Sequence, residues 1–166
     1  MSQNVLVVHG GGPTAVINAS LYGVIEEAKR NPEVGKVYGA IGGTGILSGP
    51  GNTGLPPSGA IGGTGISAPP LKLLLHTPAS AIGSSRYPLY EKDYEKMVDI
   101  FKKHDIKYVL LNGGNGTMDA CGHIYEVCKD QDIKVVGIPK TIDNDIAMTD
   151  HSPGYGSAAR FIAAST

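Results

Sequence analysis

Short apolar runs alternate along the chain with segments whose apolar residues recur at helical spacing. Runs at 5–8, 37–41, 108–111 and 133–138 predict strands, and the last, which is rich in β-branched residues, predicts a buried parallel strand. Helical spacing occurs in three sets: Ile17, Leu21, Val24, Ile25 and Ala28; Tyr94, Met97, Val98 and Phe101; and Met118, Cys121, Tyr125 and Cys128. Pro13 suits the first turn of the first helix. A segment of small residues after Gly154 completes the pattern. This alternation predicts an α/β fold, a doubly wound three-layer α/β/α domain with a mainly parallel sheet.

Residues 42–70 form a Gly- and Pro-rich insert that does not fit this alternation. The sequence of residues 39–46 recurs word for word at 59–66, and the residues between the two copies offer almost nothing to bury. Two copies are fewer than the roughly three repeats that a solenoid needs to build a core. A flexible loop, a local duplication or an engineered replacement is therefore favoured over a glycine cradle for a ligand.

Length and composition limit the class of protein. Residues 1–166 suffice for a single domain with its own core. A net charge of -1 and a pI near 6.5, with scattered basic residues, argue against a nucleic-acid partner or a membrane surface. No apolar run approaches the roughly 20 residues of a membrane helix, and no signal-like stretch precedes the first strand. Cys121 and Cys128 are too far apart on a predicted helix for a disulfide, which is typical of free thiols in a reducing cytosol, so a cytoplasmic location is expected.

Two glycine-rich turns lie where predicted strands end. The first, 9–14, leads into the first helix, and the second, 112–117, leads from the strand at 108–111 into the next helix. Glycines let phosphate oxygens approach the backbone, and a helix N-terminus supplies N–H donors and a partial positive charge. The first turn has neither the dinucleotide-binding nor the P-loop pattern. A plain turn remains an alternative for the first, and helix capping by Asn115 or Thr117 for the second. Two such turns side by side suit a di- or triphosphate.

The segment 139–145, Pro-Lys-Thr-Ile-Asp-Asn-Asp, combines charged groups at the carboxyl end of a predicted strand. Ligands of open α/β sheets bind at that edge. Of Asp143 and Asp145, one can accept a hydroxyl proton while the other holds Mg²⁺. Lys140 can offset charge on a transferred phosphoryl group, and Arg86 can grip phosphate through a bidentate fork. The alternatives are a solvated Asp-x-Asp turn and a solvated surface arginine.

These motifs occur in an order that resembles the 6-phosphofructokinase family. The matching segments are 11–18, 83–87, 113–117 and 139–145, with 149–159 extending the match. The resemblance covers residues 4–46 and 71–166. It implies the N-terminal, donor-binding part of a phosphofructokinase. It also implies transfer of a phosphoryl group from ATP or pyrophosphate to the 1-hydroxyl of fructose 6-phosphate in glycolysis, with Mg²⁺, and a homo-oligomer in the full-length family.

The resemblance further implies roles for individual residues. Asp143 resembles the family's general base, Thr141 a group near the transferred phosphoryl, and Asp145 the carboxylate partner of the base. Lys140 belongs to the same catalytic element. Contacts to the phosphate donor are implied for Gly11, Gly12, Arg86, Tyr87, Gly114, Asn115, Gly116 and Thr117. The expected Mg²⁺ ligands are Asn115 and Asp145.

Three departures from the family pattern keep a second functional hypothesis open. Asn115 stands where the family usually has the Mg²⁺-holding Asp, and an amide offers an oxygen without a charge. The sequence ends at Thr166, before the family's later sugar-phosphate-binding segments, so a partial chain is expected. The insert at 42–70 replaces a region of more ordinary composition. The second hypothesis is a non-catalytic nucleotide- or phosphate-binding module.

The residues leave the phosphate donor ambiguous between ATP and pyrophosphate. Gly116 leaves room for a nucleotide, as in ATP-using members, where pyrophosphate users usually have Asp. Lys140 resembles the pyrophosphate users, where many ATP-dependent enzymes have Gly. Some ATP-dependent members resemble this combination of Gly and Lys, which favours ATP.

Overall fold

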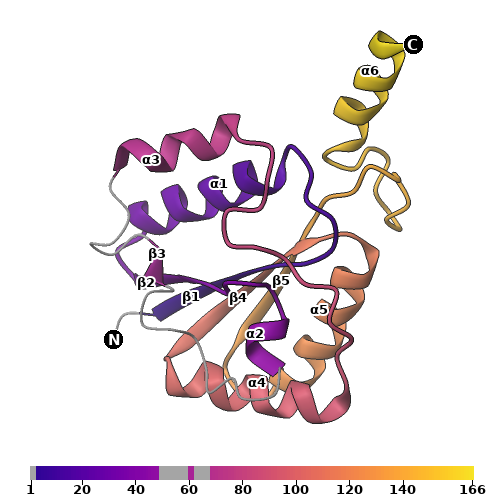
Figure 1. Ribbon diagram of the computed structural model, residues 1–166. Helices are drawn as coiled ribbons and strands as arrows, with labels where there is room; N and C mark the ends of the chain where they lie inside the picture. The colour runs from indigo at the N-terminus through magenta and orange to yellow at the C-terminus, as the bar shows by residue number, and fades with distance from the viewer. Residues whose placement is uncertain (1–2, 49–59, 62–67) are drawn as a thin grey trace.

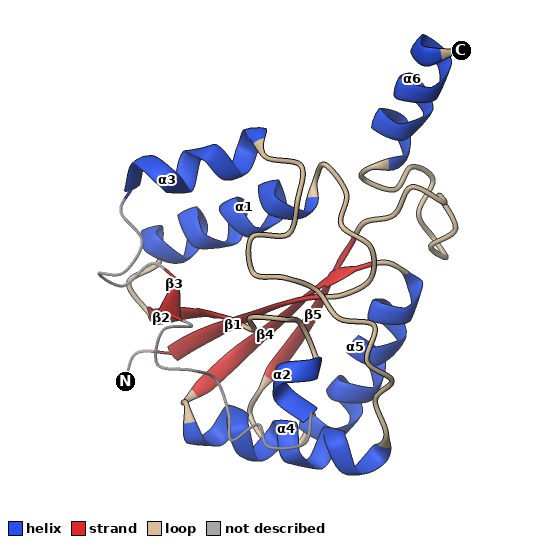
Figure 2. Ribbon diagram, viewed as in Figure 1, coloured by secondary structure: helices blue, strands red, loops and turns tan. Residues whose placement is uncertain are grey.

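A single sheet with helices on both faces forms the framework of the protein (Figures 1 and 2). The structure, a computed structural model, describes residues 3–48, 60–61 and 68–166. The strands are β1 (Gln3–His9), β2 (Val34–Gly39), β3 (Ala60–Ile61), β4 (Ile106–Gly113) and β5 (Lys134–Pro139), in the order β3-β2-β1-β4-β5. All neighbours pair in parallel except β2 and β3, which are antiparallel. The predicted mainly parallel sheet is confirmed.

The helices divide between the two faces of the sheet. One face carries α1 (Ile17–Arg30) and α3 (Ala68–Leu73), and the other carries α4 (Glu91–Lys103) and α5 (Asn115–Cys128) (Figure 2). The short α2 (Gly45–Ser48) packs beside α4, and a 3₁₀ turn, η2 (Leu74–His76), packs against α1. The last helix, α6 (Tyr155–Ser165), extends away from the sheet (Figure 1). The layers are those of the predicted α/β/α sandwich. Among the described residues, no helix is both long and apolar enough to cross a membrane.

The side chains of β1 point alternately to the two faces of the sheet and contribute to the core on both. Val5 and Val7 pack into the cluster under α1, whereas Leu6 and Val8 pack into the cluster under α4 and α5. Successive side chains of a strand point to opposite faces, so a strand covered on both sides must be apolar throughout. This explains why the run at 5–8 contains no polar residue.

Three features of the secondary structure differ from the prediction. β5 is parallel but not buried, and Val136 is 49% exposed, because β5 is an edge strand of the described sheet. On α5, Cys121 and Cys128 are buried as predicted, but Ile124 is buried in place of Tyr125, which is 52% exposed. Pro13 precedes α1, which begins at Ile17, because the glycine-rich turn continues past the proline.

The insert contributes to the sheet and to the loop that follows β2. Ala60 and Ile61 pair with Tyr38 and Val37, and Gly43 has a positive φ of 68°. A Cβ on Gly43 would overlap the carbonyl oxygen of His9. Residues 49–59 and 62–67, which include most of the second copy of the repeat, lie outside the described residues. The interpretation of the insert as a flexible loop, duplication or replacement therefore stays a prediction.

Candidate active site

The connections of the sheet reverse direction between β1 and β4. From β1 the chain continues to β2 on one side, whereas β4 lies on the other side of β1 and leads to β5. Open α/β sheets bind ligands beyond the carboxyl ends of the strands at such a switch point. The two glycine-rich turns follow β1 and β4, and the segment 139–145 follows β5. All three turns therefore meet at the edge where a ligand is expected.

These turns line a cleft of about 770 Å³. Further lining residues come from the segment 85–89 and from Thr44, which belongs to the first copy of the repeat and was not anticipated from the sequence. The cleft brings together all the site residues expected from the sequence: Gly11, Gly12, Arg86, Tyr87, Gly114, Asn115, Gly116, Thr117, Lys140, Thr141, Asp143 and Asp145. Their individual roles stay predictions.

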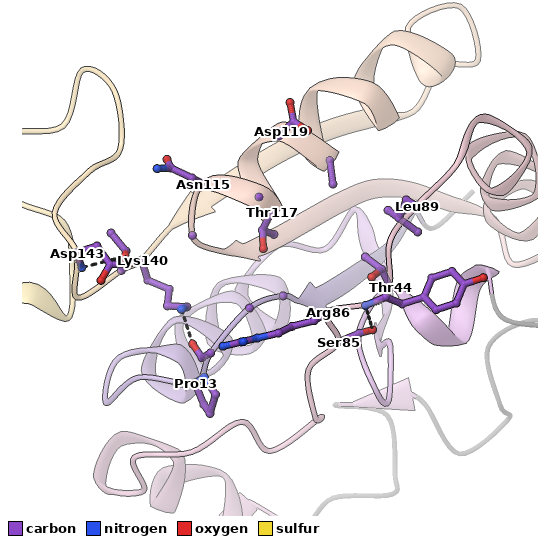
Figure 3. A pocket seen from close by; sticks show the side chains of 18 of the residues that line it. Pro13, Thr44, Ser85, Arg86, Leu89, Asn115, Thr117, Asp119, Lys140 and Asp143 are labelled. Atoms are coloured by element: carbon purple, nitrogen blue, oxygen red, sulfur yellow. Dashed lines mark hydrogen bonds between the residues drawn. The ribbon is translucent and has the colours of Figure 1, made fainter.

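Two basic side chains converge on the first glycine-rich turn (Figure 3). Lys140 is only 4% exposed, and its Nζ donates a hydrogen bond of 2.5 Å to the carbonyl oxygen of Gly12. A terminal guanidinium nitrogen of Arg86 lies 3.7 Å from the position that a Cβ on Gly12 would take. Burial lowers the pKa of Lys140, and the negative charge of Asp143 partly opposes that effect. A lysine and an arginine beside exposed backbone form a corner suited to phosphate oxygens.

The N-terminus of α5 also faces the cleft. Gly114 occupies the N-cap position and no side chain caps the helix, so the alternative in which Asn115 or Thr117 is the cap is wrong. The first N–H groups of a helix have no partner within the helix and carry a partial positive charge. A Cβ on Gly116 would have no atom within 4 Å, so the cleft is open at this position. The helix end is therefore accessible to an anion.

The first turn contributes to the cleft differently from the second. Its lining residues end at Thr14, whereas α1 begins at Ile17. The first turn of α1 is therefore not among the lining residues, and the contribution of N–H donors from the first helix stays a prediction. Between the glycines and α1 the chain does not enter a helix directly. Gly11 has a φ of 70° and forms hydrogen bonds with the segment at 84–85.

Thr117 closes the floor of the cleft between two strand ends. A Cβ on Gly10 or on Gly113 would overlap Thr117 Oγ1, so both positions require glycine. The side chain of Thr117 is consequently 8% exposed, and it packs α5 against β1 and β4. Thr117 is thus a structural residue of the cleft in addition to its expected contact with the donor.

The acidic segment is held in place by hydrogen bonds on both sides. Thr141 Oγ1 accepts a hydrogen bond of 3.1 Å from the backbone N–H of Asp143 and donates one of 3.3 Å to Asp143 Oδ2. The amide Nδ2 of Asn115 donates to the carbonyl oxygen of Asp145 at 3.1 Å. Asp143 and Asp145 are exposed and line the cleft. Both carboxylates can therefore reach a ligand.

Asn144, between the two aspartates, fixes the turn and was missed by the sequence reasoning. It has a positive φ of 54°, its Oδ1 accepts the Ser152 N–H at 2.8 Å, and its Nδ2 donates to the Asp150 carbonyl at 3.3 Å. Asparagine tolerates the left-handed conformation better than most residues. An asparagine flanked by two aspartates was the available signal for such a turn.

Asn115 and Asp145 form a donor set that fits Mg²⁺ only together with a bound phosphate. The hydrogen bond from Asn115 Nδ2 to the Asp145 carbonyl leaves Asn115 Oδ1, at the start of α5, and the Asp145 carboxylate, on the neighbouring loop, as oxygen ligands. Mg²⁺ in phosphate sites is typically held by one or two carboxylates, substrate oxygens and waters. Among the described residues, no group of three or more His, Cys, Asp or Glu could hold a metal ion. The set therefore fits a metal that arrives with its phosphate.

The fold and the cleft define an α/β domain with a cleft at a topological switch point, lined by basic side chains and by the N-terminus of a helix. The chain belongs to the phosphofructokinase family, whose sequence pattern matches residues 4–166. It is 39% identical to the pyrophosphate–fructose 6-phosphate 1-phosphotransferase of Halomonas elongata and 30% identical to an ATP-dependent 6-phosphofructokinase of Histophilus somni.

The similarity covers nearly all of this chain but less than half of each relative. The Halomonas protein matches 99% of this chain over 39% of its own length, and the Histophilus protein 95% over 45%. The crystal structure of a pyrophosphate-dependent phosphofructokinase from Nitrosospira multiformis superimposes with a TM-score of 0.86 and 36% identity. The superposition covers 99% of this chain and 40% of the Nitrosospira chain. The chain thus corresponds to one part of those longer proteins.

Proposed function

We propose that this chain is the donor-binding part of a phosphotransferase that acts on fructose 6-phosphate. The product of the reaction is a sugar bisphosphate, formed by transfer of a phosphoryl group from pyrophosphate or ATP to the 1-hydroxyl. The observation that carries the proposal is that the side chains of Lys140 and Arg86 both lie beside the backbone of Gly12, in the cleft that the N-terminus of α5 also lines. The names of the relatives support the same substrates.

The acidic segment supplies the proton acceptor in this proposal. The Asp143 carboxylate takes the proton of the 1-hydroxyl while that oxygen forms a bond to phosphorus, and the bond from phosphorus to the leaving phosphate breaks. Thr141 holds the base, since its hydroxyl bonds to Asp143, and lies near the transferred group. Lys140 and Arg86 offset charge on the phosphoryl oxygens. Asp145 is the carboxylate partner of the base.

Phosphate oxygens of the donor are held mainly by backbone N–H groups in this proposal. Gly12 and Gly114 allow close approach of the backbone, and Asn115 and Gly116 begin α5, whose first N–H groups have no partner within the helix. The N–H groups of Gly11 and Thr117 already donate to the carbonyl oxygens of Ser85 and Gly114, so these two residues line the cleft without supplying a free N–H. Tyr87 lines the cleft beside Arg86. Asn115 and Asp145 would hold Mg²⁺ together with a bound donor, and the ion would neutralise charge on the phosphate oxygens.

The donor can be pyrophosphate or ATP, and two observations favour different answers. The relative from Halomonas, at 39% identity, is named for pyrophosphate, whereas the ATP-dependent relative from Histophilus is 30% identical. The open space beside Gly116 favours a nucleotide, because a larger group fits there. Competition between the two donors for the cleft decides between them.

Replacement of the base tests the proposed reaction. Asp143→Asn should abolish phosphorylation of fructose 6-phosphate and leave the donor Kd nearly unchanged, because a general base acts on the acceptor proton in the transition state. Asp130→Asn, an equal change at an exposed aspartate outside the cleft, is the matched control. Turnover by Asp143→Asn equal to that of the parent would remove Asp143 from the mechanism.

A non-catalytic phosphate-binding module is the second candidate. It is favoured by Asn115, which brings no charge to the metal position. This candidate predicts donor binding without turnover in the parent.

In either case we expect a cytoplasmic protein, consistent with the free buried thiols of Cys121 and Cys128, that neither binds nucleic acid nor inserts into a membrane. We expect the full-length form to be a homo-oligomer.

A further inference from the structure

A buried histidine links the end of β1 to the loop that carries Arg86. His9 is 0% exposed, and its Nδ1 lies 2.7 Å from Ser80 Oγ. The single proton of the Ser80 hydroxyl is donated to the carbonyl oxygen of Gly83 at 2.6 Å. The proton between histidine and serine must therefore come from the ring, so His9 is the tautomer with hydrogen on Nδ1.

From Gly83 the chain runs directly to Arg86 along the first glycine-rich turn. The Ser84 hydroxyl donates to the carbonyl oxygen of Gly11 at 2.6 Å, and the Gly11 N–H donates to the Ser85 carbonyl at 3.3 Å. Within the described residues, the Arg86 side chain forms no ion pair with a carboxylate. The direction of Arg86 therefore depends on the backbone that carries it.

The histidine is a costly way to fill this space if packing were its only purpose. Its Nε2 is buried without a hydrogen-bond partner among the described residues. Burial, together with the nearby charge of Lys140, lowers the pKa of His9 to about 4. An apolar side chain would avoid both costs. An apolar side chain could not, however, donate the hydrogen bond that His9 Nδ1 gives to the Ser80 hydroxyl.

We propose that His9 is a positioning residue that, by holding Ser80, sets the 80–85 segment so that Arg86 meets the donor phosphate opposite Lys140. This inference rests on the proposed function, because the position of Arg86 matters only if the cleft binds a phosphate. The unit consisting of His9, Ser80 and the Gly83 carbonyl is called the His9 relay below. The relay touches neither the phosphate nor the sugar and acts through Arg86.

The relay is tested by binding of inorganic pyrophosphate, measured by calorimetry on this chain. His9→Leu and Ser80→Ala each remove the hydrogen bond, whereas His9→Asn keeps a side-chain N–H near the position of Nδ1. We expect about tenfold weaker binding for the first two variants, a double variant no weaker than either, and His9→Asn within about twofold of the parent. Ser165→Ala, at an exposed serine of α6, is the control.

The Arg86→Ala background separates positioning from a general loss of structure. If the relay acts through Arg86, Ser80→Ala should cost nothing further once the arginine is gone. An equal tenfold loss in that background would overturn the proposal, as would parent-like binding by Ser80→Ala. If His9→Leu does not fold, the cycle of Ser80→Ala with Arg86→Ala decides alone. A parent that binds no pyrophosphate would overturn the proposed function, whereas unchanged Ser80→Ala binding overturns only the relay.

Discussion

Removal of the His9 imidazole should flatten the pH dependence of stability between pH 7 and pH 4. The pKa of this side chain is about 4 in the folded protein against an ordinary value of 6.5, since burial and Lys140 both disfavour the charged form. His9→Asn leaves no titrating group at this position and keeps the N–H toward Ser80. The variant should therefore isolate the contribution of the histidine.

The sign follows from where the proton is bound. Below pH 6.5 the unfolded chain takes up a proton on His9 and the folded protein does not, so the free energy of unfolding falls as the pH falls. The loss continues until the pH passes about 4, where the folded protein is protonated as well. A shift of one unit corresponds to about 1.4 kcal/mol, so the parent should lose roughly 2 kcal/mol by pH 5 and about 3 kcal/mol by pH 4 from this group.

Urea denaturation followed by circular dichroism at pH 7, 6, 5 and 4 measures the effect. The difference in the free energy of unfolding between the parent and His9→Asn should change by about 2 kcal/mol from pH 7 to pH 5, in favour of the variant. Ser165→Ala, which removes no titrating group from an exposed position of α6, should show no such change. A constant difference between the parent and His9→Asn over this range would refute the assignment of His9 as a neutral, buried group.

Three further substitutions test the geometry of the cleft. Gly10→Ala should lower the free energy of unfolding by about 1–3 kcal/mol, because the added Cβ overlaps Thr117. Adding Thr117→Ala should restore part of that loss. If urea denaturation shows no gain in stability for the double variant, this packing is contradicted. Asn115→Asp should tighten Mg²⁺-dependent ATP binding, because a carboxylate neutralises the cation. Without Mg²⁺ the same variant should have a lower Tm, because the hydrogen bond to the Asp145 carbonyl is lost. Equal affinities for Mg-ATP in calorimetry would mean that the side chain at position 115 does not contact the metal. Gly116→Asp should weaken ATP by about 2–3 kcal/mol and pyrophosphate much less, and equal weakening in competition binding would make Gly116 a simple turn glycine.

The strands β1, β2, β4 and β5, the helices α1, α4 and α5 and the three turns of the cleft could be predicted because their signals are local, whereas β3, α2 and α3, in and beside the insert, were not predicted. A β-branched run that ends in glycines, as at 5–12, marks a strand and its exit in a few residues. Parallel pairing then places the carboxyl ends of β1, β4 and β5 at one edge. The convergence of the site residues at these three strand ends follows from that arrangement, whereas Arg86 and Tyr87 reach the cleft on a separate segment that contacts Gly11.

What the sequence could not predict depends on long-range contacts. The exposure of Val136 reflects which strand lies at the edge of the sheet, and the run at 133–138 does not encode that. Ile124 and Tyr125 are adjacent on α5, so a small error in helix phase exchanges the buried residue for the exposed one. His9 and Ser80 are 71 positions apart, and no local pattern connects them.

The most direct test of the central claim is a titration of pyrophosphate, with Mg²⁺, into the ¹⁵N-labelled chain, followed by the amide resonances. The account predicts saturable shifts at Gly11, Gly12, Gly114, Gly116 and Lys140, whose backbones line the cleft at the ends of β1, β4 and β5. It also predicts weaker binding in Arg86→Ala, because an arginine that faces the phosphate is lost. Saturable shifts confined to other parts of the chain, or no shifts at any concentration of pyrophosphate, would contradict the claim that this cleft binds the phosphate donor.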